Sequence, residues 1–325
     1  MKPKYKRLGM AFALLVVTAN QVLFAQAPPQ REIAVTIDDL PAAAAKSMAG
    51  SEITAMTAKL LGTMRDRKVP VVGFVNERKL YKFGEVDERI KALDMWLDDG
   101  FELGNHTFSH ASLSRVGLQE WEEDVVRGET VTSLLLAQHK MTKIRYLRLP
   151  YLETGRDPQT LREAEDFLLS RGYRIAPVTM DAWDWMFGGL YEDARTRGDT
   201  ALEQRLVSSY FAHTTEVFEY YEKLSRDLMG YEPKQILLLH MNWLEADHIG
   251  ELLDLLQKRG YRFITLQDAL SDQAYSTPDE LGGDDGAGWA ERWATRHGHP
   301  PPDAPAFPKW VSDRYDALPH RPTQP

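Results

Sequence analysis

The strongest constraint on the fold of this chain is the alternation of short apolar stretches with longer amphipathic ones. Residues 33–37 and 236–239 are almost wholly apolar, whereas residues 51–68 repeat apolar side chains at the spacing of a helix. A strand without a polar face is buried on both sides, as happens in a parallel sheet that helices cover on both faces. The pattern therefore predicts an α/β fold.

Several stretches have strand character, and helical stretches separate most of them. The expected strands span residues 31–37, 69–75, 100–104, 144–149, 172–178, 235–239 and 261–265. The expected helices span 51–68, 87–99, 119–140 and 246–259, and one more begins at Asp157-Pro158. Seven or so parallel strands that alternate with helices predict a distorted (β/α) barrel, with the polar clusters gathered at one mouth.

The first 27 residues have the order of a secretory signal peptide. A basic start precedes an apolar run at residues 10–17, and small and polar residues follow at 25–27. Asn20 and Gln21 interrupt the apolar run well short of the ~20 residues that a membrane span needs. We therefore expect export to the periplasm or the medium, with cleavage near residues 25–27, rather than an uncleaved membrane anchor.

After the leader, residues 28–271 are expected to form one large domain. A mostly helical insertion is predicted at about 188–233, from the spacing of its apolar residues. Residues 272–325 are rich in Gly, Pro and Asp and have no sustained periodicity. We expect this segment to be a mostly irregular tail, in which Trp289 and Trp293 belong to one helical turn.

The composition excludes several kinds of function. The chain has no cysteine, so a thiol nucleophile, a thiolate metal site, a lipoprotein anchor and disulfides are all ruled out. Its formal charge is −9, with no basic run outside the N-terminus, and nucleic-acid binding is therefore not expected. Any metal ion must be held by His, Asp or Glu.

Polar side chains follow two of the predicted strands. Asp38 and Asp39 come directly after the strand at 33–37, and His106 and His110 follow the strand that ends at residue 104. If residues 106–110 form a helical turn, both imidazoles lie on one face and can reach one point. A carboxylate and two imidazoles leave one coordination position open, which suits a catalytic metal.

Five short clusters at strand ends resemble, in type and order, the five motifs of the NodB-type polysaccharide deacetylases, carbohydrate esterase family 4. The clusters are Thr36-Ile37-Asp38-Asp39, His106-Thr107-Phe108-Ser109-His110, Arg148-Leu149-Pro150-Tyr151, Asp181-Ala182-Trp183-Asp184-Trp185 and Leu237-Leu238-Leu239-His240. The resemblance covers about residues 31–270, so the domain at 28–271 is expected to be the catalytic domain.

The resemblance implies a metal site and a pocket. Asp39, His106 and His110 would hold one divalent ion, with zinc expected first and cobalt, nickel or manganese also suited to such ligands. The backbone N–H of Tyr151 would stabilise the oxyanion together with the metal. Trp185 would line the floor of the pocket, whereas Trp183 is expected only to pack.

The resemblance also implies a separate base and acid. Asp38 would take a proton from the attacking water, and Arg148 would orient it. His240 would protonate the departing amine, with Asp181 holding and charging its ring. An amide is a poor electrophile and an amine leaves badly unless it is protonated, so the chemistry requires both groups.

The implied activity is hydrolysis of the N-acetyl group of an amino sugar in a glycan or oligosaccharide. An O-acetyl esterase, a small-amide hydrolase and a carbohydrate-binding relative without turnover are the alternatives. Single residues also have structural explanations, such as helix capping for Asp38 and Asp39. The complete base and acid set favours an enzyme, because binding alone needs neither. Leu40 and Leu152 stand where family members usually carry small residues, so the sequence does not identify the glycan.

Overall fold

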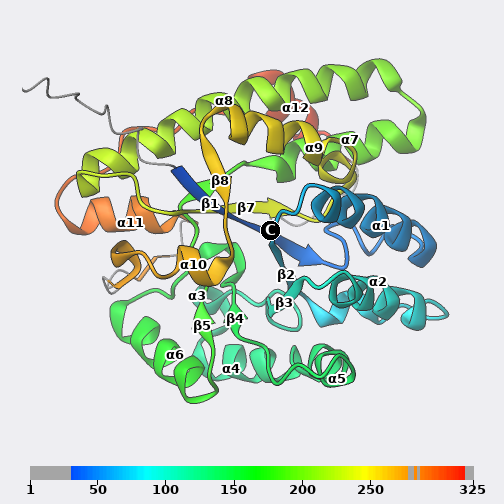
Figure 1. Cartoon of the computed structure of the whole chain (residues 1–325), viewed down its shortest axis with the longest axis horizontal. Helices are drawn as coiled ribbons and strands as arrows, with labels where there is room; N and C mark the ends of the chain where they lie inside the picture. Colours follow the sequence, from blue (N-terminus) through cyan, green and yellow to red (C-terminus); the bar gives the residue numbers. More distant parts are fainter. Residues whose placement is uncertain (1–30, 277–281, 284–285, 319–325) are drawn as a thin grey trace, which may run out of the picture. The chain divides into compact units, whose positions relative to one another are not determined.

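The computed structural model describes residues 31–276, 282–283 and 286–318 (Figure 1). The predicted leader at 1–27 lies outside the described residues, so that expectation stays a prediction. Within the described part, no helix combines the length and the apolar character needed to cross a bilayer. The described residues from Arg31 onward belong to one compact unit.

Eight strands of this unit form one sheet, in which every pairing is parallel. The strands are β1 (Arg31–Leu40), β2 (Val71–Val75), β3 (Glu102–Asn105), β4 (Tyr146–Leu147), β5 (Arg174–Ile175), β6 (Met180–Asp181), β7 (Gln235–His240) and β8 (Tyr261–Phe263). Their order is β5-β4-β3-β2-β1-β7-β6, with β8 paired to β1 off this path. The predicted α/β fold with a distorted parallel barrel is confirmed.

The barrel departs from regular strand order at β1, its longest strand. Ile33 pairs with both β7 and β8, whereas Val35 pairs with both β7 and β2. Strands β8 and β2 therefore follow one another along the same edge of β1. In the register with β7, Asp38 lies directly opposite His240, which places the predicted base and acid on neighbouring strands.

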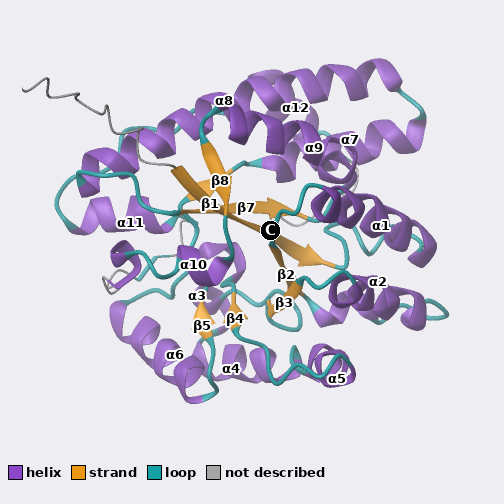
Figure 2. Cartoon of the chain, viewed as in Figure 1, coloured by secondary structure: helices purple, strands orange, loops and turns teal. Residues whose placement is uncertain are grey.

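Helices surround the sheet (Figure 2). The longer helices are α1 (Gly50–Asp66), α2 (Val86–Asp98), α4 (Leu118–Arg127), α5 (Thr130–Gln138), α6 (Pro158–Ser170), α7 (Asp184–Arg197), α8 (Thr200–Met229) and α9 (Trp243–Lys258). The short helices are α3 (Leu113–Val116), α10 (Leu266–Ala269), α11 (Trp289–Arg296) and α12 (Lys309–Asp316), with 3-10 turns η1 (Glu77–Leu80), η2 (Pro150–Leu152) and η3 (Gln273–Ser276). Asp157 caps α6 as predicted, because its carboxylate accepts from the N–H groups of Gln159 and Thr160.

Two expectations about the helices were wrong. The single helix predicted at 119–140 is two helices, α4 and α5, which meet near Gly128. A Cβ at Gly128 would lie 2.9 Å from backbone atoms of Thr107 and Phe108, so the close approach of this corner to the histidine loop requires glycine. The C-terminal segment is also more regular than predicted, because both α11 and α12 are full helices of eight residues. Residues 188–233 fall largely within α7 and α8, as expected for a mostly helical segment.

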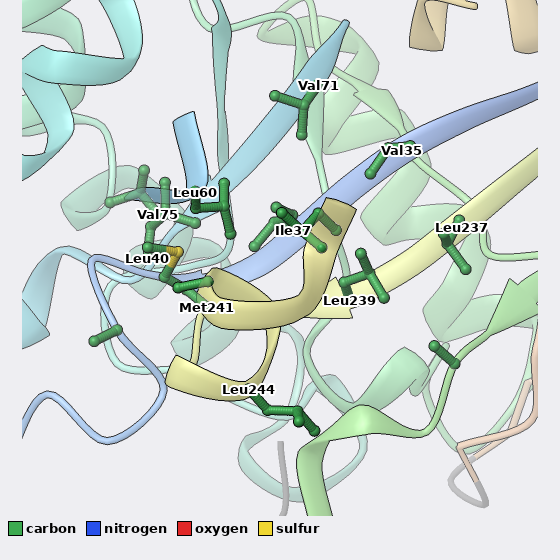
Figure 3. Close-up of a cluster of buried hydrophobic side chains, with 14 of the residues drawn as sticks. Val35, Ile37, Leu40, Leu60, Val71, Val75, Leu237, Leu239, Met241 and Leu244 are labelled. Carbon is green, nitrogen blue, oxygen red and sulfur yellow. The ribbon is translucent and has the colours of Figure 1, made fainter. Parts of the chain in front are cut away.

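The main core fills the space between β1, β2, β7 and the helices around them (Figure 3). Ile37 of β1 and Leu239 of β7 pair with each other and are fully buried. Burying one such side chain contributes roughly 1.5–3 kcal/mol, so this layer fixes the strand ends that carry Asp38 and His240.

Substitution of Leu239 tests this layer. We expect Leu239→Ala to lower the free energy of unfolding by about 2–5 kcal/mol, because it leaves a cavity in a closely packed core. Leu169 is 73% exposed, and Leu169→Ala should change stability by only about 0.5 kcal/mol. Urea unfolding of both variants measures the difference. Equal free energies of unfolding for the two variants would show that the side chain of Leu239 does not stabilise the strand ends.

Candidate active site

The predicted site residues converge at the C-terminal ends of the strands. They surround a cavity of about 330 Å³. Seven of the nine line it directly: Asp38, His106, His110, Tyr151, Asp181, Trp185 and His240. The other two lie immediately behind this lining, Asp39 beside His110 and Arg148 beside Asp38. The sequence clusters therefore form one site, as their positions at strand ends predicted.

Asp39, His106 and His110 form a compact set of potential metal ligands. The Nε2 atoms of the two histidines are 3.1 Å apart, and His110 Nε2 is 3.9 Å from Asp39 Oδ1. Bonds of roughly 2.0–2.1 Å in tetrahedral geometry would separate neighbouring zinc ligands by about 3.3 Å. The three side chains therefore fit one small divalent ion.

The protonation of the histidines also suits metal binding. His106 Nδ1 lies 2.8 Å from the carbonyl oxygen of Arg148, which can only accept, so Nδ1 carries the proton and Nε2 is bare. Burial holds the pKa of His106 well below its usual value. Burial likewise lowers the pKa of His110 to about 4, although Asp39 acts in the opposite direction. Two neutral imidazoles with converging nitrogens are a donor set for a divalent cation.

The two histidines come from a loop, not from a helical turn. Thr107 and His110 have φ of 60° and 62°, in the left-handed region that non-glycine residues rarely adopt. Side chains stabilise this backbone: Asn105 Oδ1 accepts from the N–H of Thr107, and Asp124 Oδ2 accepts from the N–H of Ser109. Such strain costs on the order of 1–3 kcal/mol per residue and is typical of functional sites.

Asp38 is held from behind by Arg148. The guanidinium is fully buried and donates to Asp38 Oδ2 at 3.3 Å, to Thr36 Oγ1 at 2.9 Å and to the carbonyl of Ala176 at 2.8 Å. Burial raises the pKa of Asp38 to about 6, against the opposing charges of Arg148 and His240. Among the described residues, no group hydrogen-bonds to Asp38 Oδ1. One carboxylate oxygen is thus held by Arg148, and the other is buried without a hydrogen-bond partner among the described residues.

Asp184, and not the predicted Asp181, holds the ring of His240. Asp184 Oδ1 is 2.7 Å from His240 Nδ1, and its Oδ2 accepts from the His240 N–H and from Asn242 Nδ2. Asp181 lies in β6 opposite Leu238, two residues before His240, and its Oδ1 accepts from the N–H of Trp183 instead. The first turn of α7 brings Asp184 to the ring, which the spacing of the sequence motif did not reveal.

This pairing sets the charge of His240. Burial acts to lower the pKa of His240, but the buried carboxylate of Asp184 outweighs it and raises that pKa to about 9. The imidazole is therefore protonated at neutral pH. Because Nδ1 is occupied by Asp184, Nε2 is the nitrogen that can donate into the pocket. Burial raises the pKa of Asp181 to about 7.

Lys79 lies beside the candidate metal ligands, and no motif of the sequence pointed to it. Lys79, on the turn η1, donates to Asp39 Oδ1 at 2.5 Å. Burial opposes the ionisation of Asp39, but Lys79 and the two histidines outweigh it and hold the pKa of Asp39 well below its usual value. Asp39 is therefore ionised at any working pH.

Tyr151 and Trp185 both line the pocket but pack against different neighbours. The ring of Tyr151 contacts the ring of His110, with centroids 4.4 Å apart, and the guanidinium of Arg115 lies 4.7 Å above the Tyr151 ring. Tyr151 has φ 61°, which turns the chain sharply after β4. Trp185 packs edge to face on Phe307, from the C-terminal segment, at 5.7 Å. The role of the Tyr151 N–H as an oxyanion donor stays a prediction.

Residues 25–168 match the family model described as polysaccharide deacetylase. The match spans 144 of the 325 residues, which is less than half of the chain. The matched part holds Asp38, Asp39, both histidines of the loop and Arg148, whereas Asp184 and His240 lie beyond it.

Individual relatives are distant. A peptidoglycan-N-acetylglucosamine deacetylase of Bacillus cereus is 23% identical over 154 residues, 47% of this chain and 46% of the relative. The chain thus matches less than half the length of this curated deacetylase. Among solved structures, a family 4 carbohydrate esterase from Streptomyces lividans in complex with acetate is 17% identical, with a TM-score of 0.45 over 75% of this chain and 97% of that one. A pseudoenzyme of the same family from Bacillus anthracis is 17% identical, with a TM-score of 0.46 over 75% of this chain and 67% of that one.

Proposed function

We propose that this chain is a member of the polysaccharide deacetylase family, and that it is a metal-dependent deacetylase that hydrolyses the N-acetyl group of an amino sugar in a glycan or oligosaccharide. The main support for this proposal is the arrangement of the groups that line the cavity. The carboxylate of Asp38, with one oxygen that has no hydrogen-bond partner among the described residues, and the protonated imidazole of His240 line one cavity beside three candidate metal ligands. Binding a glycan requires neither a base nor an acid, whereas hydrolysing an amide requires both.

Asp39, His106 and His110 would hold the ion, for which zinc is our first candidate. When bound, a divalent ion supplies Lewis-acid polarisation of the acetamide carbonyl and acidifies water. Lys79 would remain the partner of Asp39 and orient its carboxylate, in the manner of groups that support metal ligands from outside.

The chain's own residues would move the protons. Asp38 Oδ1 would accept the proton of the attacking water, while Arg148 holds Oδ2 and keeps the carboxylate ionised. His240 would donate from Nε2 to the nitrogen of the departing amine. Asp184, which accepts from Nδ1, would keep that imidazole charged and correctly oriented. The register of β1 with β7 places these two groups side by side at the same strand ends.

Release of acetate tests the function. Purified protein would be incubated with N-acetylglucosamine oligomers, peptidoglycan and acetylated xylan, each with and without a chelator. We expect acetate and free amine in equal amounts from the N-acetylated substrates, abolished by the chelator and restored by zinc. Acetate from xylan alone would indicate an O-acetyl esterase. Binding without any release would indicate a carbohydrate-binding relative.

The ligand assignment can be tested without activity. We expect His106→Ala and His110→Ala to lose the bound ion, because two ligands hold it too weakly to survive dialysis. Elemental analysis should give about one ion per wild-type chain and almost none in either variant. His139→Ala is the control, because His139, Asp94 and Asp98 form a second, more exposed group of potential ligands. Loss of the ion in His139→Ala, but not in His106→Ala, would move the site there.

We also propose that the protein is exported and that it works in the periplasm or outside the cell. The basic start and short apolar run of residues 1–27 support this proposal. N-terminal sequencing of protein recovered from those fractions should find a mature chain that begins near Gln26 or Pro28. An intact Met1 in membrane-bound protein would indicate an anchor.

A further inference from the structure

The C-terminal segment contributes a side chain to the catalytic pocket. Phe307, between α11 and α12, lines the same cavity as Asp38 and His240. It lies outside the part of the chain that matches the family model, at residues 25–168, and outside the five sequence clusters. Its presence in the cavity therefore needs its own explanation.

Phe307 is held in place by four aromatic rings. Its centroid is 5.1 Å from both Trp183 and His213, 5.7 Å from Trp185 and 5.9 Å from Phe187. Burial lowers the pKa of His213 to about 4, so the stacked imidazole is neutral and packs like the others. Rings at these distances gain about 0.5–1.5 kcal/mol per pair beyond the area they bury. These contacts therefore fix the side chain of Phe307 in one position.

The helix that follows anchors the same segment to α7 and α8. Tyr315 of α12 is buried and packs edge to face on Trp185 at 5.3 Å. Trp310 lies 3.9 Å below the guanidinium of Arg205, on α8. The segment is therefore part of the folded pocket and not a loose tail.

Trp183 shows that this side of the pocket is strained. Its φ of 54° and ψ of 34° put a bulky residue in the left-handed region, which is a genuine outlier for such a side chain. The conformation is held by the hydrogen bond from its N–H to Asp181 Oδ1 and by the stacking on Phe307. Backbone strain of this kind is concentrated at ligand-binding sites, which argues that Trp183 does more than pack.

Other residues of the pocket lining are polar. Arg115, whose side chain is 65% exposed, forms an ion pair with Glu153 at 3.2 Å and lies over Tyr151. A sugar ring has the matching asymmetry, with apolar C–H faces and a rim of hydroxyl groups. Its faces can pack on aromatic rings through dispersion and loss of water, while its hydroxyls bond to charged groups.

We propose that Phe307, with Trp183 and Trp185, forms an aromatic wall that limits the pocket to short N-acetylated saccharides or the ends of longer chains. The cavity of about 330 Å³ is at the small end of the usual range for ligand pockets, about 300–1,000 Å³. A long glycan that runs through the site would need that wall removed. This inference rests on the proposed function, because it concerns the substrate of the same site.

The test compares wild type with Phe307→Ala on an N-acetylglucosamine disaccharide and on a long soluble polymer of the same sugar. We expect the KM for the disaccharide to rise about 5- to 30-fold, the factor that one or two lost contacts of this kind give. The ratio of kcat/KM for polymer to that for disaccharide should rise as well. Phe211→Ala is the matched control, because Phe211 is also half-buried among aromatic rings on α8 but is not part of the pocket lining. It should change neither value.

A binding measurement separates this inference from the proposed function. Calorimetric titration of the disaccharide into Asp38→Asn, with and without Phe307→Ala, reports on the wall even if no acetate is ever released. Weaker binding in the double variant would support the wall whatever the reaction. Equal binding, or an unchanged preference between polymer and disaccharide, would overturn the inference. A thermal melt of each variant verifies that the pocket remains folded.

Discussion

Replacing Asp38 by Asn is expected to lower kcat/KM by about 10²–10⁴-fold, the usual contribution of one general base. The variant keeps nearly the same shape, and Arg148 can still donate to the amide oxygen at this position. It cannot accept a proton from water. The metal content should stay at the wild-type level, because the three ligand atoms belong to other residues.

Asp39→Asn provides the comparison for this prediction. Asp39 is the neighbouring carboxylate on the same strand, and its loss should release the ion as well as the activity. Elemental analysis alongside acetate release distinguishes the two variants. If Asp38→Asn loses the ion while Asp39→Asn retains it, the two aspartates have been assigned the wrong way round.

The fall of activity at low pH is also expected to depend on Asp38. A general base works only when ionised, and burial raises the pKa of Asp38 to about 6. Activity should therefore fall as the pH drops below about 6. A cation bound at the neighbouring ligands favours the carboxylate and would move this fall to lower pH. In Asp38→Asn the residual rate should no longer show this limb, which a pH titration of both proteins can measure.

The fold could be predicted because strands that are buried on both faces consist of apolar residues, and such runs can be recognised in the sequence. The apolar runs at β1, β2 and β7 could only be strands covered on both faces, and the polar groups that follow them had to meet at one edge. The short strands β4, β5 and β6 were harder to delimit, since each has two residues and exists through pairing with a neighbour. Tertiary context, not local sequence, sets their ends.

The residues of the site could be predicted from the sequence, but the side chains to which each of them bonds could not. Ligand and base candidates could be named because each follows a buried strand. The choice between Asp181 and Asp184 could not be made from spacing, because it depends on the register of β6 against β7 and on the turn into α7. Lys79 and Phe307 belong to no motif, and only the folded chain brings them to Asp39 and to the pocket.

Replacing His240 by Ala should also cost about 10²–10⁴-fold in kcat/KM, because the amine would leave without a proton donor. The more discriminating variant is Asp184→Asn, which keeps the imidazole and removes the charge that holds its proton. The pKa of His240 should then fall from about 9 toward or below the ordinary value of about 6.5.

The sign of the effect on activity follows from these values. A general acid works only when protonated, so the wild-type rate should fall as the pH rises through about 9. Without Asp184 the protonated fraction at pH 8 would drop by about 30-fold, while at pH 6 it would change little. The alkaline limb of the pH profile should therefore move down by two units or more. Circular dichroism and a thermal melt establish that the variant remains folded, since removing one partner of a buried ion pair is also destabilising.

Asp181→Asn decides between the two aspartates. Asp181 lines the pocket, but its carboxylate bonds to the backbone of Trp183 and not to the imidazole. Its replacement should leave the alkaline limb near pH 9, whatever it does to the maximal rate. A limb that moves in Asp181→Asn and stays in place in Asp184→Asn would return the role to Asp181. Near-normal turnover in His240→Ala would remove this histidine as the acid, and the amine would then have to take its proton from another group at the cavity.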